Sequence, residues 1–290
     1  KGSVVTPAMM LELSRAVQRV LIRPEVSGVV VTQPADNIEE TAYFVSISLS
    51  DVFQNQNSKP IVFTTCMNPE DPMFDGTKNL LDSIRVACHD VKGDISTVVV
   101  CMNGEIHAAS RAQLTHTNKA SALASPGWGP VGYVDRDNVY FRCGALELDT
   151  GLNFPMLKKL TAKVPVVKAM CGDDGALLEM FLEKEPDAII VEGFGRGNLP
   201  AGMMPAIKKA VKKGIFVVIS TRASSGRVLD STVFPGSVAQ CLECGCLLAG
   251  ETTTSKARLL LMYVLSQKEA IQLKKEDPER FFAYVQECLD

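Results

Sequence analysis

The amino-acid sequence predicts an α/β protein with parallel β-sheets, and two features of the chain support this prediction. Runs of β-branched residues recur, and polar loops followed by stretches with helical spacing separate them. Such runs are typical of parallel strands, which are apolar on both sides because helices cover both faces of the sheet. The run Val29–Val31 shows this best, because the polar loop Thr32–Asn37 and a helix beginning at Ile38 follow it. Ligands bind such sheets at the carboxyl ends of the strands, where this loop lies.

In the first half of the chain, the expected elements follow from capping residues and from the spacing of apolar residues. Thr6 is placed to cap a helix from Ala8 to about Leu21, with Pro7 in its first turn. The run Val29–Val31 is expected to be a buried strand. The other expected elements are helices from 38 to about 52 and over 79–87, and strands over 59–65, 94–102 and 139–141, the last at a sheet edge.

The pattern weakens between residues 144 and 163, which predicts a linker there. We therefore expect a first domain over residues 1–143 and a second α/β domain over residues 164–290. In the second domain, strands are expected over 164–170, 188–191 and 215–220. Helices are expected over 175–183, from a start at about 205, and over 278–289. The segment between 247 and 261 is expected to contain the end of a strand, a loop and a helix.

Bulk composition excludes several functional classes. The chain has 290 residues, of which 46% are hydrophobic and 22% charged, and a net charge of −3 with both signs interspersed. This charge gives no electrostatic basis for binding nucleic acid or an anionic membrane. No apolar run approaches the roughly 20 residues that a membrane-spanning helix needs. Nothing at the start is typical of a secretory signal or a transit peptide, and because residue 1 is Lys1, a processed or truncated form is expected.

The cysteines indicate a reducing compartment. There are nine of them, an odd number, and they are scattered mostly through apolar segments. An intracellular protein, cytoplasmic or mitochondrial, is expected. Cys241, Cys244 and Cys246 form the one cluster with metal-like spacing. A structural zinc needs four ligands and no fourth cysteine or histidine lies near, so we predict no metal and interpret these cysteines as packing residues.

The loop after the first strand offers polar side chains but no good nucleophile. Thr32, Gln33, Asp36 and Asn37 could face a ligand. Ala35 stands where a hydroxyl would be useful for nucleophilic catalysis. Asp36 alone could accept hydrogen bonds from an α-amino group, so the loop is expected to bind more readily than to react.

This stretch resembles the asparaginase/glutaminase family, in which the loop reads Thr-His-Gly-Thr-Asp-Thr and is followed by Leu-Glu-Glu-Thr-Ala-Tyr-Phe. Thr32, Asp36 and residues 39–44 match this pattern. The family's catalytic Thr is replaced by Ala35. The resemblance extends from Ser3 to about Gln267 and implies a larger N-terminal parallel-sheet domain, a smaller C-terminal α/β domain and pairing of subunits into oligomers.

Further catalytic positions of the family also differ here. The family's Ser that binds the substrate α-carboxylate corresponds to Ser3, for which an ordinary loop serine is an equal alternative. The family's catalytic Lys falls on Leu114 in an ungapped count, which also matches Ser125 with the family's Ser-Pro. It falls on His116 if Thr-Lys-Thr-Asn is aligned instead. The upstream Thr-Gly-Gly-Thr that carries the family's primary nucleophile does not occur in this sequence.

A glycine-rich turn over residues 193–199 resembles the family's Gly-x-Gly-x-Gly-Asn-Leu. A dinucleotide-binding fingerprint is the alternative, but the glycine spacing and the acidic residue that such a site requires are missing. We therefore predict no cofactor.

Three functional hypotheses follow. The first is a catalytically inactive asparaginase-like protein that serves as a structural or accessory subunit or binds a small amino acid through Ser3 and Asp36. The second is an active asparaginase or related amidohydrolase whose nucleophilic Thr lies in a segment before Lys1. The third is a different activity that recruits Ser3, His116 or Cys66, which requires a contact between nucleophile and base. A homo-oligomer or membership of a larger assembly is expected in the first case.

Overall fold

The computed structural model describes residues 2–55, 59–67, 74–89, 98–142, 153–230 and 232–289. The chain divides into two compact units, Lys1–Lys158 and Lys159–Asp290. This division lies within residues 144–163, whose role as a linker stays a prediction because 143–152 lie outside the described residues. Within the described part of the chain, no helix has both the length and the apolar character needed to span a membrane.

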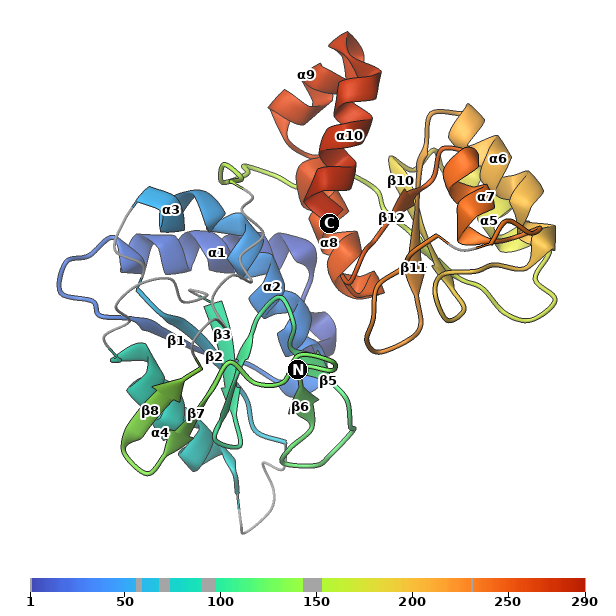
Figure 1. The fold of residues 1–290 in the computed structure, drawn as a ribbon. Helices are drawn as coiled ribbons and strands as arrows, with labels where there is room; N and C mark the ends of the chain where they lie inside the picture. Colours follow the sequence, from blue (N-terminus) through green and yellow to red (C-terminus); the bar gives the residue numbers. More distant parts are fainter. Residues whose placement is uncertain are drawn as a thin grey trace. The chain divides into compact units, whose positions relative to one another are not determined.

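Unit 1 is built on a mixed six-stranded sheet (Figure 1). Its strand order is β1-β2-β3-β4-β7-β8, with parallel pairing from β1 to β3 and antiparallel pairing from β3 to β8. A separate two-stranded ribbon pairs β5 with β6. The strands are β1 (Val29–Thr32), β2 (Ile61–Thr64), β3 (Val98–Met102), β4 (Glu105–Ala108), β5 (Gln113–Leu114), β6 (Leu123–Ala124), β7 (Gly132–Asp135) and β8 (Asn138–Phe141).

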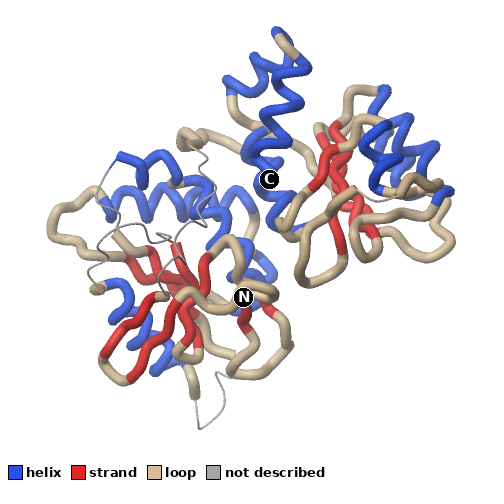
Figure 2. The backbone as a smooth tube through the Cα atoms, in the orientation of Figure 1, coloured by secondary structure: helices blue, strands red, loops and turns tan. Residues whose placement is uncertain are grey.

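Helices cover both faces of this sheet, as the tube view also shows (Figure 2). Side chains alternate between the faces of a strand, so Ile61 and Phe63 of β2 pack with α1 and α2, whereas Val62 packs with α4. These buried apolar side chains form the core of the unit. The helical elements are η1 (Gly2–Val4), α1 (Pro7–Leu21), η2 (Ala35–Asn37), α2 (Ile38–Ser48), α3 (Ser50–Asn55) and α4 (Gly76–Ala87).

Unit 2 is a four-stranded, all-parallel sheet with the order β12-β11-β10-β9. Helices α5, α6 and α7 pack on one face, and α8 packs against β10 on the other (Figure 1). The strands are β9 (Val166–Lys168), β10 (Ala188–Gly193), β11 (Phe216–Thr221) and β12 (Leu247–Leu248). The helical elements are α5 (Ala176–Leu182), η3 (Ala201–Met203), α6 (Met204–Lys212), α7 (Val238–Glu243), α8 (Thr254–Val264), α9 (Lys268–Glu276) and α10 (Pro278–Leu289).

Most of the expected elements are confirmed, with two main differences, and one expectation lies partly outside the described residues. Thr6 caps α1 by accepting a hydrogen bond from the N–H of Met9 at 3.3 Å. The helix expected over 38–52 instead ends at Ser48, and α3 begins at Ser50. The helix expected over 79–87 begins earlier, at Gly76, and residues 94–97 of the strand expected over 94–102 lie outside the described residues.

The prediction of a fully buried first strand is wrong. β1 lies at the edge of the sheet, and Val29, Val30 and Val31 are only half-buried. By contrast, every residue of β2 and β3 is buried. β1 therefore has the apolar sequence that is typical of an interior strand, although it lies at the edge of the sheet.

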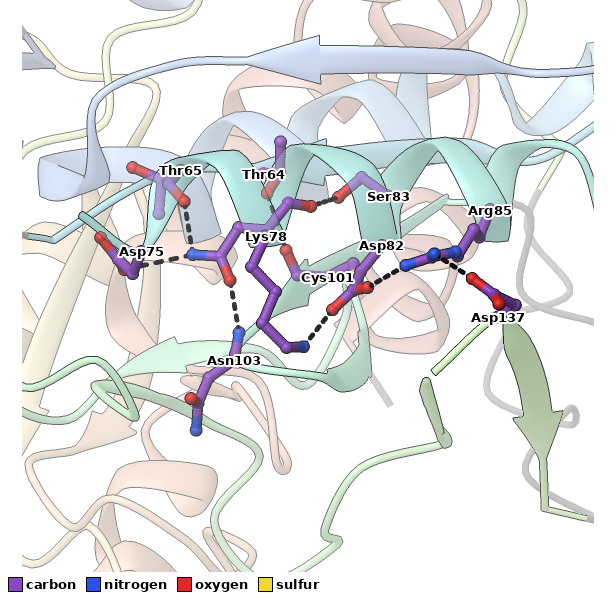
Figure 3. Close-up of polar contacts among 11 residues, drawn as sticks. Thr64, Thr65, Asp75, Lys78, Asp82, Ser83, Arg85, Cys101, Asn103 and Asp137 are labelled. Carbon is purple, nitrogen blue, oxygen red and sulfur yellow. Dashed lines mark hydrogen bonds and ion pairs between the residues drawn. The ribbon is translucent and has the colours of Figure 1, made fainter. Parts of the chain in front are cut away.

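A buried amide ties the ends of β2 and β3 to α4. Asn79 is 1% exposed and donates hydrogen bonds to the carbonyl of Thr65 at 3.0 Å and to the carboxylate of Asp75 at 3.2 Å. Its Oδ1 accepts from the N–H of Asn103 at 2.9 Å. Figure 3 shows Thr65, which follows β2, and Asn103, which follows β3, converging on α4, whereas Asp75 directly precedes that helix. One amide thus bonds three groups, of which the Thr65 carbonyl belongs to a buried residue, whereas the Asp75 carboxylate also accepts from the N–H of Met67 at 3.2 Å.

The other half of α4 carries a charged cluster (Figure 3). Asp82 is 1% exposed and forms ion pairs with Lys78 and, at 3.0 Å, with Arg85. Arg85 also pairs with Asp137, in the turn between β7 and β8. These pairs tie the antiparallel end of the sheet to α4, although the exposed partners limit their contribution to stability.

A buried histidine links the central sheet to the β5–β6 ribbon. His107 of β4 is 1% exposed, and its Nδ1 lies 3.0 Å from the hydroxyl of Ser125, which directly follows β6. Its Nε2 lies 3.4 Å from the Glu105 carboxylate but makes no well-aligned hydrogen bond within the described part of the chain. Burial lowers the pKa of His107, and the nearby Glu105 opposes this effect only in part. His107 is therefore neutral in the folded protein at pH 7.

Asn79→Ala is expected to destabilise unit 1 by about 2 kcal/mol, because it leaves the buried Thr65 carbonyl without its donor and removes the bonds that Asn79 makes to the Asp75 carboxylate and the Asn103 N–H. Urea unfolding would measure this. The exposed Thr77→Ala on the same helix is the control, with an expected change within about 0.5 kcal/mol. A loss below about 1 kcal/mol in Asn79→Ala would contradict the role assigned to this amide.

Stability is expected to fall as the pH drops below about 6.5, the ordinary histidine pKa. Below this pH His107 becomes protonated in the unfolded chain, whereas in the folded chain it stays neutral until the pH reaches its lowered pKa. Between these two pKa values, the free energy of unfolding falls by up to about 1.4 kcal/mol per pH unit. Unfolding free energies measured across this range should show a flatter slope in His107→Gln. His116→Gln, at a half-exposed histidine, is the control. An unchanged slope in His107→Gln would refute this assignment.

Candidate functional site

The loop between β1 and α2 is the centre of the candidate site, and hydrogen bonds within unit 1 fix its path. The N–H of Gln33 continues the β1–β2 pairing by donating to the carbonyl of Thr64 at 3.2 Å. The side-chain amide of Gln33 donates to Asn37 Oδ1 at 3.4 Å and to Thr41 Oγ1 at 3.2 Å. The loop is thus braced against the first turn of α2, which holds η2 and its residues Ala35 and Asp36 at the carboxyl end of the sheet.

The structure brings the elements of Ser3 and Asp36 together. Asn37 Nδ2 donates to the carbonyl of Gly2 at 3.1 Å, which ties η1 to η2. The Asp36 side chain packs so closely on Gly2 that a Cβ at that position would lie 2.7 Å from its Oδ2. Gly2 therefore permits this close approach. Ser3 and Asp36 are both exposed, so both side chains are accessible to a ligand.

The β5–β6 ribbon carries one of the two positions considered for a catalytic lysine. The N–H of Leu114 donates to the carboxylate of Glu39, in the first turn of α2. This contact anchors the ribbon next to the loop that carries Ala35. The half-buried Leu114 side chain packs against the core that lies beneath α1 and α2. An aliphatic side chain at this place supplies no charge and no base.

His116, the other position considered, has a local structural contact. Its Nδ1 accepts hydrogen bonds from the N–H groups of Asn118 and Lys119, both at 3.2 Å. These bonds brace the turn between β5 and β6, and they occupy the ring nitrogen that a base would use.

A cavity of about 410 Å³ opens beside the loop. It lies at the carboxyl ends of β1 and β2 and at the start of α4, and Cys66 forms part of its wall. The described residues of its lining are mainly apolar and offer hydroxyl, thiol and amide groups but no carboxylate, histidine or lysine. These residues are Thr32, Gln33, Pro34, Thr64, Thr65, Cys66, Phe74, Gly76 and Leu80. A cavity of this size, with apolar surface and a few polar groups, is typical of small-molecule sites.

The sequence alone did not point to three of the residues that shape this region. His107 lies on β4, a short strand that the apolar pattern did not predict. Glu39 matches a motif and Asn79 lies in an expected helix, but their partners Leu114 and Asn103 lie 75 and 24 positions away in the chain. His107 and Ser125 form a contact of base and hydroxyl, but both are buried, so substrate has no access to the pair.

The cysteine cluster of unit 2 lies in the core. Cys241 and Cys246 are buried among the apolar residues packed between α5–α7 and the sheet, whereas Cys244 is half-buried. Among the residues that the structure describes, no group of three or more histidine, cysteine or acidic side chains is placed to hold a metal ion. Asn198 in the glycine-rich turn accepts from the N–H of Val238 at 3.2 Å and so supports the start of α7.

Comparisons with known proteins agree with this architecture in both units. Residues 1–145 match the family model described as "Asparaginase, N-terminal", and residues 163–276 match the "Glutaminase/Asparaginase C-terminal domain". The structure of a probable cytoplasmic L-asparaginase from Campylobacter jejuni superimposes with a TM-score of 0.82 at 26% identity, covering 98% of this chain and 84% of that one.

Curated relatives include enzymes and a component of a larger complex. The L-asparaginase of Bacillus licheniformis is 30% identical over 93% of this chain and 81% of its own length. One of the subunits of the glutamyl-tRNA(Gln) amidotransferase of Pyrococcus horikoshii is 27% identical over 85% of this chain and 56% of its own length. Both domain matches and the similarity to the Bacillus enzyme establish that the chain belongs to the asparaginase/glutaminase family.

Proposed function

We propose that this chain is a catalytically inactive asparaginase-like protein that binds a small amino acid and serves as an accessory subunit. The observation that carries the proposal is Ala35, which occupies the exposed loop where the family's threonine would stand. A methyl group cannot attack an amide carbon and has no proton to transfer. Loss of one nucleophile from such a catalytic set costs on the order of 10⁴–10⁶ in rate.

The surroundings of Ala35 support the same proposal. Leu114 provides no amine, and His116 uses its Nδ1 for a turn. Asp36 remains exposed beside η1, where its carboxylate could accept hydrogen bonds from an α-amino group while Ser3 meets an α-carboxylate. Under this proposal, Ser3 and Asp36 bind the two ends of an amino acid, and the groups that would cleave its side-chain amide are missing.

Two further parts of the proposal concern partners and location. Some relatives are subunits of an amidotransferase. We therefore propose that this chain either acts as an accessory subunit of a larger assembly or forms a homo-oligomer. An intracellular site, cytoplasmic or mitochondrial, is proposed from the scattered cysteines, eight of which are free thiols in the described part of the chain.

One observation favours a second candidate function, an active asparaginase completed by a segment that precedes Lys1 in the full-length protein. In β1, the N–H groups of Val29 and Gln33 point toward β2, so those of Val30 and Thr32 point toward the sheet edge. No strand in the described part of the chain pairs with β1 at this edge, which is therefore suited to receive another strand. Such a strand could carry a nucleophile to this end of the sheet, although it would not replace the groups missing at Ala35 and Leu114.

Asp36→Asn is expected to weaken binding of L-aspartate about tenfold, because it removes the charge that pairs with the ligand's ammonium group. Isothermal titration calorimetry would measure the affinity. Asp135→Asn, an equally exposed carboxylate at the end of β7, is the control and should bind as the wild type does. Equal affinities for all three proteins would argue against Asp36 as the binding group.

The double variant Ala35→Thr, Leu114→Lys is expected to release ammonia from L-asparagine at least about 100-fold faster than the wild type, because it restores a hydroxyl and an amine near Asp36. Ala35→Val, Leu114→Lys is the matched control, since valine has the shape of threonine without the hydroxyl. A folded double variant that shows no gain would mean that Leu114 is not the lysine position.

A further inference from the structure

Unit 2 holds a polar cluster that the site in unit 1 does not use. It consists of Lys168 at the end of β9, Glu192 on β10, Ser220 on β11 and Thr254 at the start of α8. Lys256, two residues farther along α8, is also fully buried, whereas Leu259 and Leu260 beyond it are buried apolar residues. Four polar side chains therefore gather where a helix packs on a sheet, at the carboxyl ends of parallel strands.

The strand register places three of these residues side by side. Glu192 pairs directly with Lys168 on one side and with Ser220 on the other. Directly paired residues of neighbouring strands project from the same face of a sheet. Val191, the neighbour of Glu192 in the chain, packs in the core formed with α5–α7, so Glu192 faces the opposite side, which α8 covers.

The contacts form a continuous set of hydroxyl, carboxylate and amine. Thr254 Oγ1 donates to Glu192 Oε2 at 2.8 Å, and Lys168 Nζ lies 2.8 Å from Glu192 Oε1. Ser220 Oγ lies 3.0 Å from Thr254 Oγ1. Because Thr254 uses its only proton toward Glu192, Ser220 must donate to Thr254. Thr254 thus has a carboxylate in place to accept its proton.

Burial leaves one side of the cluster open to solvent. Ser220 is fully buried, and the Glu192 side chain is 15% exposed. Thr254 is half-buried, and the Lys168 side chain is 53% exposed. The exposed side of the cluster is therefore formed by Lys168 and Thr254, whereas both residues of the His107–Ser125 pair of unit 1 are buried.

Fold stability alone does not call for this set of residues. Burying a charge costs several kcal/mol, and well-packed apolar residues at such positions are often at least as stabilising. The side chain of the N-cap Thr253 makes no capping hydrogen bond to the backbone of α8, an 11-residue helix. Thr254 is the first residue of α8, so the positive end of that helix lies beside its hydroxyl and would stabilise the oxyanion that develops on the carbonyl oxygen of an acyl group bound there.

We propose that Thr254 is a nucleophile for acyl transfer, with Glu192 as its general base and Lys168 as the cation that pairs with Glu192. The substrate class is a small activated acyl ester. The Thr254 Oγ–acyl bond forms as the ester C–O bond breaks, and the hydroxyl proton passes to Glu192. The leaving oxygen takes the bonding electrons and departs either as a phenolate or, after receiving the proton from Glu192, as an alcohol. Water then attacks the acyl group, and Thr254 recovers its proton as the carboxylic acid is released.

The test uses the intact chain with p-nitrophenyl acetate as the probe. We expect release of about one p-nitrophenolate per chain in a fast first phase, which is the pattern of an acyl-enzyme intermediate. Peptide mass spectrometry of the quenched protein should locate the acetyl group on Thr254. Ser255→Ala, which removes a neighbouring hydroxyl that lies 3.5 Å from that of Thr253, is the control and should react as the wild type does.

Two variants separate this chemistry from a structural role. Thr254→Val should abolish the fast phase, and Glu192→Gln, which keeps the shape of the side chain, should slow it by about 100-fold or more. Circular dichroism checks that each variant is folded. If Thr254→Val does not fold, the proposal is tested by the rate of the fast phase in Glu192→Gln and by the site of acetylation in the wild type. Acetylation of the wild type only at lysines, or no acetyl group on Thr254, would overturn the proposal.

Discussion

The parallel pairing of neighbouring strands is the constraint on which both parts of this molecule depend. In unit 1, the N–H of Gln33 extends the β1–β2 pairing to the carbonyl of Thr64, so the two strands end at the same level. The candidate loop and the 410 Å³ cavity both lie at these ends. In unit 2, the same kind of register aligns Glu192 with Lys168 and Ser220. In each unit, polar chemistry collects where parallel strands end, because loops and helix N-termini converge there.

Buried polar contacts hold the elements of unit 1 together. Asn79 satisfies groups at the ends of β2 and β3, and His107 connects β4 to the ribbon through Ser125. Removing one partner from such a contact leaves a buried group without a hydrogen bond, which is costly. Ala35 lies on an exposed loop, where a hydroxyl can be lost at little cost to stability. A family member could therefore lose its reaction and keep its fold.

How far the sequence predicted the structure depended on the distance between interacting residues. The strands over β-branched runs and the Thr6 cap were predictable, because their signals are local. The edge position of β1 was not predictable from the sequence, since an apolar run gives no information about which strands are neighbours in the sheet. Short strands such as β4 lack a long enough pattern. In the site, Ala35 and Asp36 were predicted to share a loop, whereas the Glu39–Leu114 and Glu192–Thr254 contacts join positions far apart in the chain.

The central claim is that this protein binds a small amino acid without hydrolysing its side-chain amide. The most direct test is to measure ammonia release from L-asparagine and L-glutamine by the wild-type protein with its authentic N-terminus. We predict no release above the uncatalysed background, together with measurable binding of the amino acid. Turnover at ordinary enzyme rates, about 1–10³ s⁻¹, would contradict this prediction. Such a rate would mean that the hydroxyl missing at Ala35 is not required, and that either a segment preceding Lys1 or an unrecognised base carries the reaction.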